Sequence, residues 1–212
     1  MKAMFVSIEG IDGCGKTTQI KLLEEYLSLL DVEFAIVREP GGTRAGEEIR
    51  EILLHKDYPL CAESELLLFM AARAQIVREV IKPALESGRI VIADRFMDSS
   101  VAYQGVGRCL GREIVQLMNS FAVADTLPDI TLYIDVPADV AISRMRKERK
   151  NDKIEVESLE FFERVRKGYE ELMAENRERF VVIDGTNSEE RVQQDIRKAL
   201  SVFLGKRKPN GR

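Results

Sequence analysis

The sequence has few residues of the kinds that form disulfides or zinc sites. Its 212 residues include three cysteines and one histidine, and Cys14, Cys61 and Cys109 stand at unrelated spacings. An odd number of cysteines without histidine companions fits neither a disulfide framework nor a zinc-binding pattern. We therefore expect a reduced, cytoplasmic protein.

An excess of basic charge is also missing. The 32 lysines and arginines are outnumbered by 36 acidic residues, which gives a net charge of -4 and a pI near 5.4. A chain of this charge has no broad affinity for nucleic acid or for an anionic membrane, so neither is an expected partner. Any anion that it binds must be held locally by a few well-placed cations.

Long apolar runs, internal repeats and low-complexity linkers are absent as well. The apolar part of MKAMFVSIEG is too short for a signal peptide or a membrane span, and we expect it to form a strand. A chain of this length buries roughly 70% of its unfolded surface in one core. We expect a single domain over residues 1–204 and a loose basic tail over 205–212.

Short apolar runs alternate with segments of helical spacing along the whole chain. Five runs are typical of buried parallel strands: FVSIE (5–9), FAIVR (34–38), RIVIAD (89–94), ITLYIDV (130–136) and RFVVID (179–184). Apolar residues three and four apart predict helices between them, as at Ile20, Leu23, Leu27, Leu30 and at Ile114, Leu117, Met118, Phe121. This pattern predicts an α/β domain whose parallel sheet is covered on both faces, with a ligand crevice at the carboxyl ends of the strands.

The last helix has a predicted start signal. Thr186 followed by Glu189 resembles a capping box, in which a hydroxyl and an acidic side chain bond reciprocally to free backbone N–H groups. The helix that follows is expected to turn four residues inward: Val192, Ile196, Leu200 and Phe203.

A glycine-rich loop follows the first predicted strand. Residues Gly10, Ile11, Asp12, Gly13, Cys14, Gly15, Lys16 and Thr17, with Thr18 after them, match G-x-x-x-x-G-K-[ST] between a strand and a helix. Such a loop curls its N–H groups around phosphate oxygens at the positive end of a helix dipole. Lys16 is expected to reach the outer phosphates of ATP and the Thr17 hydroxyl to hold Mg²⁺. Cys14 occupies a variable position, where we expect it to pack as a small residue.

Four arginines are expected near the same crevice: Arg38, Arg50, Arg73 and Arg95. Because the guanidinium group suits phosphate, their convergence indicates a second anionic ligand, although each alone could be a solvated surface charge. Arg95 is the exception because it follows Asp94, which ends a largely apolar strand. The preceding Asp94 is a candidate Mg²⁺ ligand, with a helix cap as the alternative.

A phosphate monoester is the acceptor that suits such a crevice. Its second pKa of about 6 leaves it mostly dianionic at neutral pH, so it needs charge neutralisation rather than a strong base. A GTPase should also carry N-K-x-D and a separate D-x-x-G, and the sequence has neither. A nucleotide-dependent binding module that hydrolyses slowly stays open as an alternative, as does a kinase for another nucleoside monophosphate or a deoxynucleoside.

Several motifs together resemble the thymidylate kinase family: GIDGCGKTT, REPGGT, DRF, DSSVAYQG, FMAAR and the late segment FFERVRKGY. The resemblance implies a three-layer P-loop fold with a five-stranded parallel sheet in the order 2-3-1-4-5. It also implies a homodimer that uses ATP and Mg²⁺ to convert dTMP to dTDP.

The same resemblance implies roles for individual residues. Arg95, and more weakly Arg38, would hold the phosphate of dTMP, and Asp12 would lie near the 3'-hydroxyl and the metal. The other implied contacts of the nucleoside are Phe69 stacked on thymine, Arg73 on the base edge, Arg50 lining the thymine pocket, Ser99, Ser100 and Gln104 completing base reading, and Tyr103 against the 2' position of the sugar. For Phe69 and Tyr103, ordinary core packing is the alternative.

The resemblance departs at Gly13, where some members of the family carry an arginine. In members without it, a mobile lid supplies the arginine, which here would come from SRMRKERKNDK, near residues 143–154. Arg149 is the first candidate and Arg146 the second, while Arg144 would contact the ATP base. Without the resemblance, this cluster would be interpreted as a solvated helix face.

Overall fold

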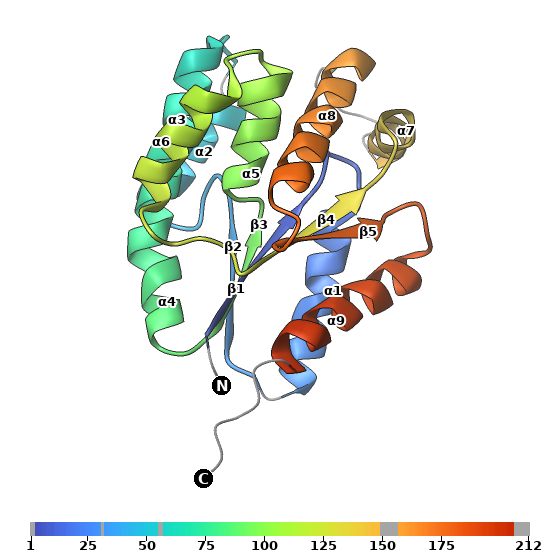
Figure 1. Ribbon diagram of the computed structural model, residues 1–212. Helices are drawn as coiled ribbons and strands as arrows, with labels where there is room; N and C mark the ends of the chain where they lie inside the picture. The colour runs from blue at the N-terminus through green and yellow to red at the C-terminus, as the bar shows by residue number, and fades with distance from the viewer. Residues whose placement is uncertain (1–2, 31, 55–56, 149–156, 206–212) are drawn as a thin grey trace.

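Five parallel strands form the sheet of the computed structural model, which describes residues 3–30, 32–54, 57–148 and 157–205, with the backbone alone at 148 and 203–205. The strands are β1 (Met4–Glu9), β2 (Phe34–Arg38), β3 (Ile90–Asp94), β4 (Ile130–Asp135) and β5 (Phe180–Asp184). Their order is β2-β3-β1-β4-β5 (Figure 1). The structure confirms the expected α/β fold and strand order, and each predicted strand is right to within one residue at either end.

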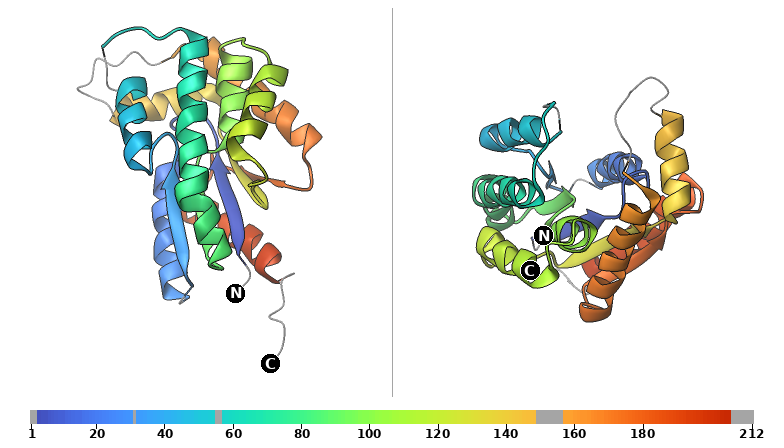
Figure 2. Two further views of the ribbon diagram at one scale, coloured as in Figure 1. Left: turned by 90° about the vertical axis from the view of Figure 1, so that its left-hand side faces the viewer. Right: turned by 90° about the horizontal axis from the view of Figure 1, so that it is seen from above.

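Helices surround this sheet. They are α1 (Lys16–Leu29), α2 (Arg44–Leu54), α3 (Ala62–Ile76), η1 (Val77–Ile81), α4 (Lys82–Glu86), α5 (Met97–Ser100), η2 (Val101–Gly107), α6 (Arg112–Val123), α7 (Ala138–Glu148), α8 (Leu159–Glu175) and α9 (Glu189–Gly205), where η marks π-helical turns. Viewed from above, α2 and α3 lie on one side of the sheet and α7 and α9 on the other (Figure 2).

The core has two sides because strand side chains alternate between the faces of the sheet. Phe5 of β1 packs on one side with Ile76 and Ile81 of the long helix that runs from α3 through η1 to α4. Val6 and Leu23 belong to the larger cluster, to which α1 contributes. Burial on both faces explains why the central strands β1, β3 and β4 are nearly continuous apolar runs, whereas the edge strands β2 and β5 are partly exposed.

Two polar residues interrupt the apolar run of β1. Ser7 and Glu9 are fully buried, and by the alternation of the strand they lie on the same side as Phe5. A buried carboxylate needs hydrogen-bond donors, since its transfer out of water is costly. The surroundings of Glu9 must therefore supply them.

The structure confirms the helix that apolar spacing predicted here, as α6, yet part of the apolar stripe of this helix faces outward. Leu117 is 67% exposed and Phe121 is 83% exposed, while Val115 and Val123 of the same helix are buried. The helix therefore carries a second apolar face that the described residues do not cover.

The expected capping box at the last helix is wrong. The helix begins later, and the Ser188 hydroxyl caps it by accepting a hydrogen bond from the Arg191 N–H at 3.3 Å. Thr186 instead donates its hydroxyl proton to Asp184 at 2.6 Å, in the turn before the helix. Val192, Ile196 and Leu200 are buried as expected, and the side chain of Phe203 lies outside the described part of the chain.

Candidate active site

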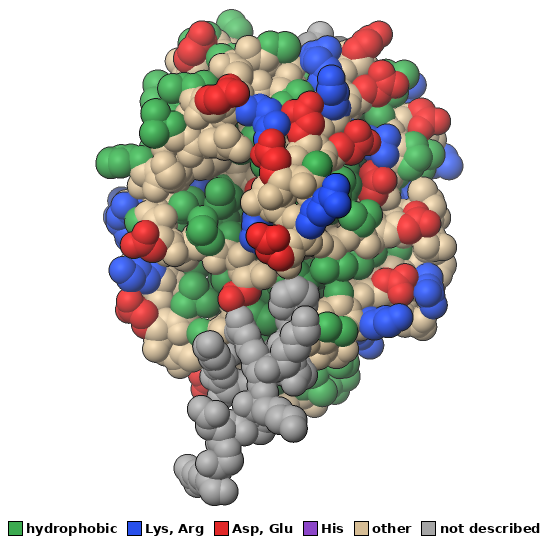
Figure 3. Space-filling model, in the orientation of Figure 1, with side chains coloured by type: hydrophobic (Ala, Val, Ile, Leu, Met, Phe, Trp, Pro, Cys, Tyr) green, Lys and Arg blue, Asp and Glu red, His purple; other side chains and the backbone are tan. Residues whose placement is uncertain are grey.

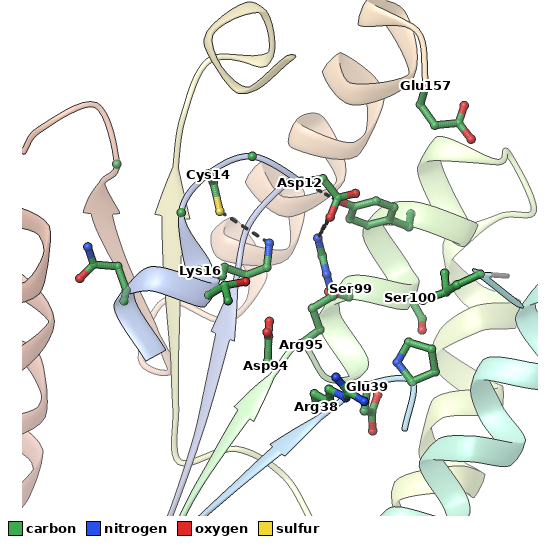
Figure 4. Close-up of a pocket in the computed structure, with 18 of the residues that line it drawn as sticks. Asp12, Cys14, Lys16, Arg38, Glu39, Asp94, Arg95, Ser99, Ser100 and Glu157 are labelled. Atoms are coloured by element: carbon green, nitrogen blue, oxygen red, sulfur yellow. Dashed lines mark hydrogen bonds and ion pairs between the residues drawn. The ribbon is translucent and has the colours of Figure 1, made fainter. Parts of the chain in front are cut away.

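A cavity of about 870 Å³ lies at the carboxyl ends of the strands (Figure 4). The sheet register aligns Ile8 and Arg38 with Asp94 of β3, which lies between their strands. The loops that follow these positions therefore meet at one edge of the sheet. This is where a ligand crevice is expected in an open parallel sheet.

The phosphate loop forms one wall of the cavity. Gly13 and Gly15 have φ angles of +78° and +98°, which a glycine adopts without strain. These angles curl the chain tightly, and α1 begins directly after Gly15, at Lys16. The Asp12 and Cys14 N–H groups donate to the Tyr103 hydroxyl and to the Ile11 carbonyl oxygen, so the positive end of α1 and the other N–H groups of the loop are what an anion in the cavity would meet.

Lys16 is held inside this loop and is only 7% exposed. Its ammonium group donates to the carbonyl oxygens of Gly10 and Ile11, both at 3.0 Å, and to Cys14 Sγ at 3.6 Å. Gly10 and Ile11, two of the predicted nucleotide-binding residues, do not line the cavity. In this structure they orient the lysine.

Arg95 occupies the middle of the cavity wall. One of its terminal nitrogens donates to Asp12 Oδ1 at 2.5 Å and to the Tyr103 hydroxyl at 3.0 Å, and the other donates to Ser99 Oγ at 3.1 Å (Figure 4). The guanidinium also lies over the Tyr103 ring, 4.7 Å from its centroid. Four predicted site residues from the phosphate loop, the β3–α5 turn, α5 and η2 therefore meet at this point.

The charges around Arg95 set the ionisation of its neighbours. Burial opposes ionisation of Asp12, but the positive charges of Arg95 and Lys16 lower the pKa of that carboxyl below its usual value. Burial raises the pKa of the Tyr103 hydroxyl well above its usual value. Asp12 is therefore an anion and Tyr103 a neutral hydroxyl at physiological pH. Arg95 is the donor in its hydrogen bonds with both residues.

The other end of the cavity is lined by α2, α3 and η2. Phe69 presents its ring there, together with Ser100 and Gln104. Gln104 is held by its amide, which donates to Glu65 at 2.8 Å. An aromatic face beside amide and hydroxyl groups can hold a flat, polar-edged ring such as a base.

Two further arginines lie at the edge of this region. Arg38 lines the cavity and pairs with Glu47 at 3.0 Å on the protein surface. Arg50 also lines it and donates to the carbonyl oxygen of Pro40 at 2.8 Å. Both side chains are therefore held by partners within the protein.

Arg73 lies beneath the cavity rather than in its lining, and it is 1% exposed. One of its terminal nitrogens pairs with Glu39 at 2.5 Å, and the other terminal nitrogen donates to Ser100 Oγ at 2.9 Å and to Asn119 Oδ1 at 2.6 Å. Burial raises the pKa of Glu39, although the charge of Arg73 opposes this. Contact between Arg73 and a base edge stays a prediction, since in this structure Ser100 lies between Arg73 and the cavity.

The opposite end of the cavity is lined by one predicted residue and by several that the sequence did not indicate. The predicted one is Arg144 of α7, which was expected to contact the ATP base and which donates to the Gly185 carbonyl oxygen at 3.0 Å. Asn187, Glu189 and Val192 line the same end. The turn GTN (185–187) directly after a predicted strand was the available signal, because every strand of a parallel sheet ends at this edge.

Most predicted site residues line one cavity. From the loop these are Asp12, Gly13, Cys14, Gly15, Lys16, Thr17 and Thr18, and from elsewhere Arg38, Arg50, Phe69, Asp94, Arg95, Ser99, Ser100, Tyr103, Gln104 and Arg144. Arg146 is exposed on α7 away from the cavity lining. Arg149 and the rest of the predicted lid up to residue 154 lie outside the described residues, as does the predicted tail from residue 206.

Comparison with known proteins identifies the family. The family described as Thymidylate kinase matches residues 8–196. The chain belongs to the thymidylate kinase family. The match includes the phosphate loop, the β3–α5 turn with Arg95, and the Gly185–Val192 end of the cavity.

Individual members of the thymidylate kinase family are similar over almost their whole length. A thymidylate kinase of Kosmotoga olearia is 57% identical over 96% of this chain and 98% of its own. One from Fervidobacterium nodosum is 55% identical over 95% of this chain and all of its own. The crystal structure of a thymidylate kinase from Ehrlichia chaffeensis has a TM-score of 0.79 at 37% identity, and covers 95% of this chain and 99% of that one.

None of the described helices combines the length and the apolar character that crossing a membrane requires.

Proposed function

We propose that this protein transfers the γ-phosphoryl group of ATP to the phosphate of dTMP, which yields ADP and dTDP. One observation carries the proposal: a single cavity is lined both by the phosphate loop and by Arg95, Tyr103 and Phe69. The family membership supports the identity of both nucleotides. Two anionic ligands in one cavity are what transfer between two phosphates requires.

The donor end of the cavity suits ATP. The loop N–H groups and Lys16 bind and orient the outer phosphates, and Arg144 with the Gly185 turn lies where the base of the nucleotide would extend. The Lys16 ammonium now bonded to two carbonyl oxygens supplies positive charge to the oxygens of the transferring group. Fixed charges of this kind stabilise the transition state without reorganisation.

The acceptor end suits a deoxynucleoside monophosphate. Arg95 faces the cavity as a charged planar donor for the phosphate, and Phe69 offers a ring face for the base. Asp12 and Tyr103 lie beside Arg95, where they would contact the sugar and exclude a ribose hydroxyl. Because the acceptor phosphate is already ionised at neutral pH, these residues need only position it and neutralise its charge.

Mg²⁺ belongs to this proposal, and the residues present fit it. Thr17 and Asp94 line the cavity beside the phosphate loop, and hydroxyl and carboxylate oxygens are the ligands that Mg²⁺ prefers together with substrate phosphates. When bound, the ion would neutralise charge on the phosphates of ATP. We further propose that an arginine of the lid, Arg149 or Arg146, approaches the transferring group when the site closes.

We also infer that the protein is a homodimer in the cytoplasm. Apolar side chains gather over α3 and α6, at the left edge in Figure 3. A groove there of about 670 Å³ is lined almost wholly by apolar residues: Leu67, Met70, Ala71, Ala74, Leu117, Met118, Ser120, Phe121 and Ala122. Such a face is typical of an interface between two copies. The three cysteines are free thiols, which supports a reducing compartment.

The function is tested by ADP release over a panel of acceptors: dTMP, dUMP, other monophosphates, and deoxynucleosides. We expect the highest kcat/KM with dTMP, and a preference for another acceptor would contradict the substrate assignment. ATP turnover indifferent to every acceptor would instead indicate a binding module. Lys16→Ala is expected to lower kcat by about 100-fold, the usual effect of removing one preorganised charge donor. Unchanged turnover would exclude the loop as the catalytic cradle.

A further inference from the structure

Glu9 is a buried carboxylate that the proposed chemistry does not use. It ends β1 directly before the phosphate loop, is fully buried, and is not among the residues that line the cavity. Burial, together with the negative charge of Asp98, raises the pKa of Glu9. A carboxyl group in such a place is costly unless several donors satisfy it.

Four donors from different parts of the chain converge on this carboxylate. Ser7 Oγ at 2.8 Å and the Phe96 N–H at 2.7 Å donate to Oε1. Ser99 Oγ at 2.5 Å and the Tyr169 hydroxyl at 2.9 Å donate to Oε2. Two of these partners, Phe96 and Ser99, lie one and four residues after Arg95 in the chain, so Glu9 holds the segment that carries the arginine.

The backbone at Arg95 needs such support. Its φ angle is +68°, in the left-handed region, which strains the backbone of a residue other than glycine. The Arg95 N–H donates to the Ile8 carbonyl oxygen at 3.1 Å, and the next N–H, that of Phe96, donates to Glu9. Two successive amides of the strained turn are thus fastened to the end of β1, one of them through the Glu9 side chain.

Glu9 also determines the direction of the Ser99 hydroxyl. This hydroxyl has one proton, which it donates to Glu9, so its lone pairs are left to accept the hydrogen bond from Arg95 at 3.1 Å. Figure 4 shows Ser99 beside Arg95, with Asp12 on the other side of the guanidinium. The arginine is therefore held from its backbone, through Phe96, and from its side chain, through Ser99.

We infer that Glu9 is a positioning residue for the acceptor: it holds the β3–α5 turn and the Ser99 hydroxyl in the arrangement that presents Arg95 to the phosphate of dTMP. The inference rests on the proposed function. Glu9 acts behind Arg95 and touches neither nucleotide.

Glu9→Gln tests this role, because glutamine keeps the shape and one acceptor oxygen, but its amide nitrogen is a donor and cannot accept the two hydrogen bonds of the carboxylate oxygen that it replaces. We expect the KM for dTMP to rise by about 10-fold or more, the effect of weakening one charge-assisted hydrogen bond. The KM for ATP should stay within about twofold, since the hydrogen bonds of the Glu9 side chain run to Ser7, Phe96, Ser99 and Tyr169, none of which belongs to the phosphate loop. An unchanged KM for dTMP, or an equal rise in both KM values, would overturn the inference.

Asp98→Asn is the matched control. Asp98 is a buried carboxylate on α5, the short helix that carries Ser99, but it pairs with Arg179 at 2.6 Å and with Thr131 at 3.2 Å. We expect this variant to lower the Tm and leave the KM for dTMP within about twofold. If it raises that KM as much as Glu9→Gln does, the effect is a general loss of packing and the positioning role is wrong.

A double-mutant cycle with Arg95→Ala separates positioning from folding. Once the arginine is absent, Glu9→Gln should add no further loss of dTMP affinity in titration calorimetry, and additive losses would contradict the inference. If Glu9→Gln does not fold, Tyr169→Phe removes one donor to Glu9 together with the 2.9 Å contact between the Tyr169 and Ser99 hydroxyls, and we expect about a threefold rise in the KM for dTMP. No rise in that folded variant would overturn the role.

Wild-type turnover distinguishes the two possible failures. An inactive wild type with dTMP contradicts the proposed function, and the same cycle is then run on whichever monophosphate the panel identifies. An active wild type with no effect of Glu9→Gln contradicts only the inference.

Discussion

Gly13 of the phosphate loop lies against α7. A Cβ atom built there would be 2.4 Å from the Ala141 carbonyl oxygen and 2.9 Å from Met145 Cγ. Some members of the family carry an arginine at this position, yet in this structure any side chain would collide with the backbone of α7. The packing of α7 on the loop therefore depends on a glycine at residue 13.

Gly13→Ala is expected to displace α7 or the loop and to lower kcat/KM for ATP by about 10-fold or more, as over-packing in a tight site does. Steady-state kinetics measure this effect. Gly15→Ala is the control, because it imposes the same backbone strain at φ +98° but its Cβ would have nothing within 4 Å. If the two variants lose equal activity, backbone strain and not the collision with α7 is responsible.

Single residues of the site differed in how far the sequence could predict them. The phosphate loop is a local pattern, so its residues and its place between a strand and a helix were predictable. The partners of Glu9 were not, because Phe96, Ser99 and Tyr169 are 87, 90 and 160 positions away in the chain. Nothing local to a buried strand indicates which distant donors its last residue will meet.

The helices show where a pattern predicts an element but not its environment. Apolar spacing predicted α6 correctly, yet the same spacing turns Leu117 and Phe121 outward. Periodicity shows that one face of a helix is apolar, but it does not say whether that face meets the core or another molecule. The central strands β1, β3 and β4 were easier, because burial on both faces leaves no alternative environment for an apolar run.

The start of α9 depends on Ser188 and not on Thr186. Ser188→Ala is expected to lower the free energy of unfolding by about 1 kcal/mol, since it removes the side-chain acceptor for the Arg191 N–H. For a chain of this length that corresponds to a Tm about 2–4 °C lower in calorimetry.

Thr186→Ala is the contrasting variant for α9. The Thr186 hydroxyl bonds only within an exposed turn, to Asp184, so its loss should change stability by no more than about 0.5 kcal/mol. If Thr186→Ala loses more stability than Ser188→Ala, the cap assigned to Ser188 is contradicted and a capping box at Thr186 is supported.

On the scale of the whole molecule, the described residues form a broad apolar face over α3 and α6. Phe121, at its most exposed point, is expected to bury its ring in a second copy. Phe121→Glu should convert a dimer to a monomer in size-exclusion chromatography with light scattering, since a buried charge without a partner opposes association.

Leu29 on α1 provides the control for the dimer. It is 85% exposed, nearly the same as Phe121 at 83%, but it lies on a different helix away from this face. Leu29→Glu should leave the molecular mass in solution unchanged. A monomeric wild type, or a Phe121→Glu variant that remains dimeric, would contradict the proposed interface.

The direction of the strands also has a practical consequence. The cavity lies at the carboxyl ends of the strands, whereas β1 starts and α9 finishes at the opposite pole of the molecule (Figure 1). An affinity tag or a bead coupled near the start of β1 or near the end of α9 would point away from the opening of the cavity. The protein could thus be immobilised on a support with its entrance facing the solution, where nucleotides diffuse in and out unhindered.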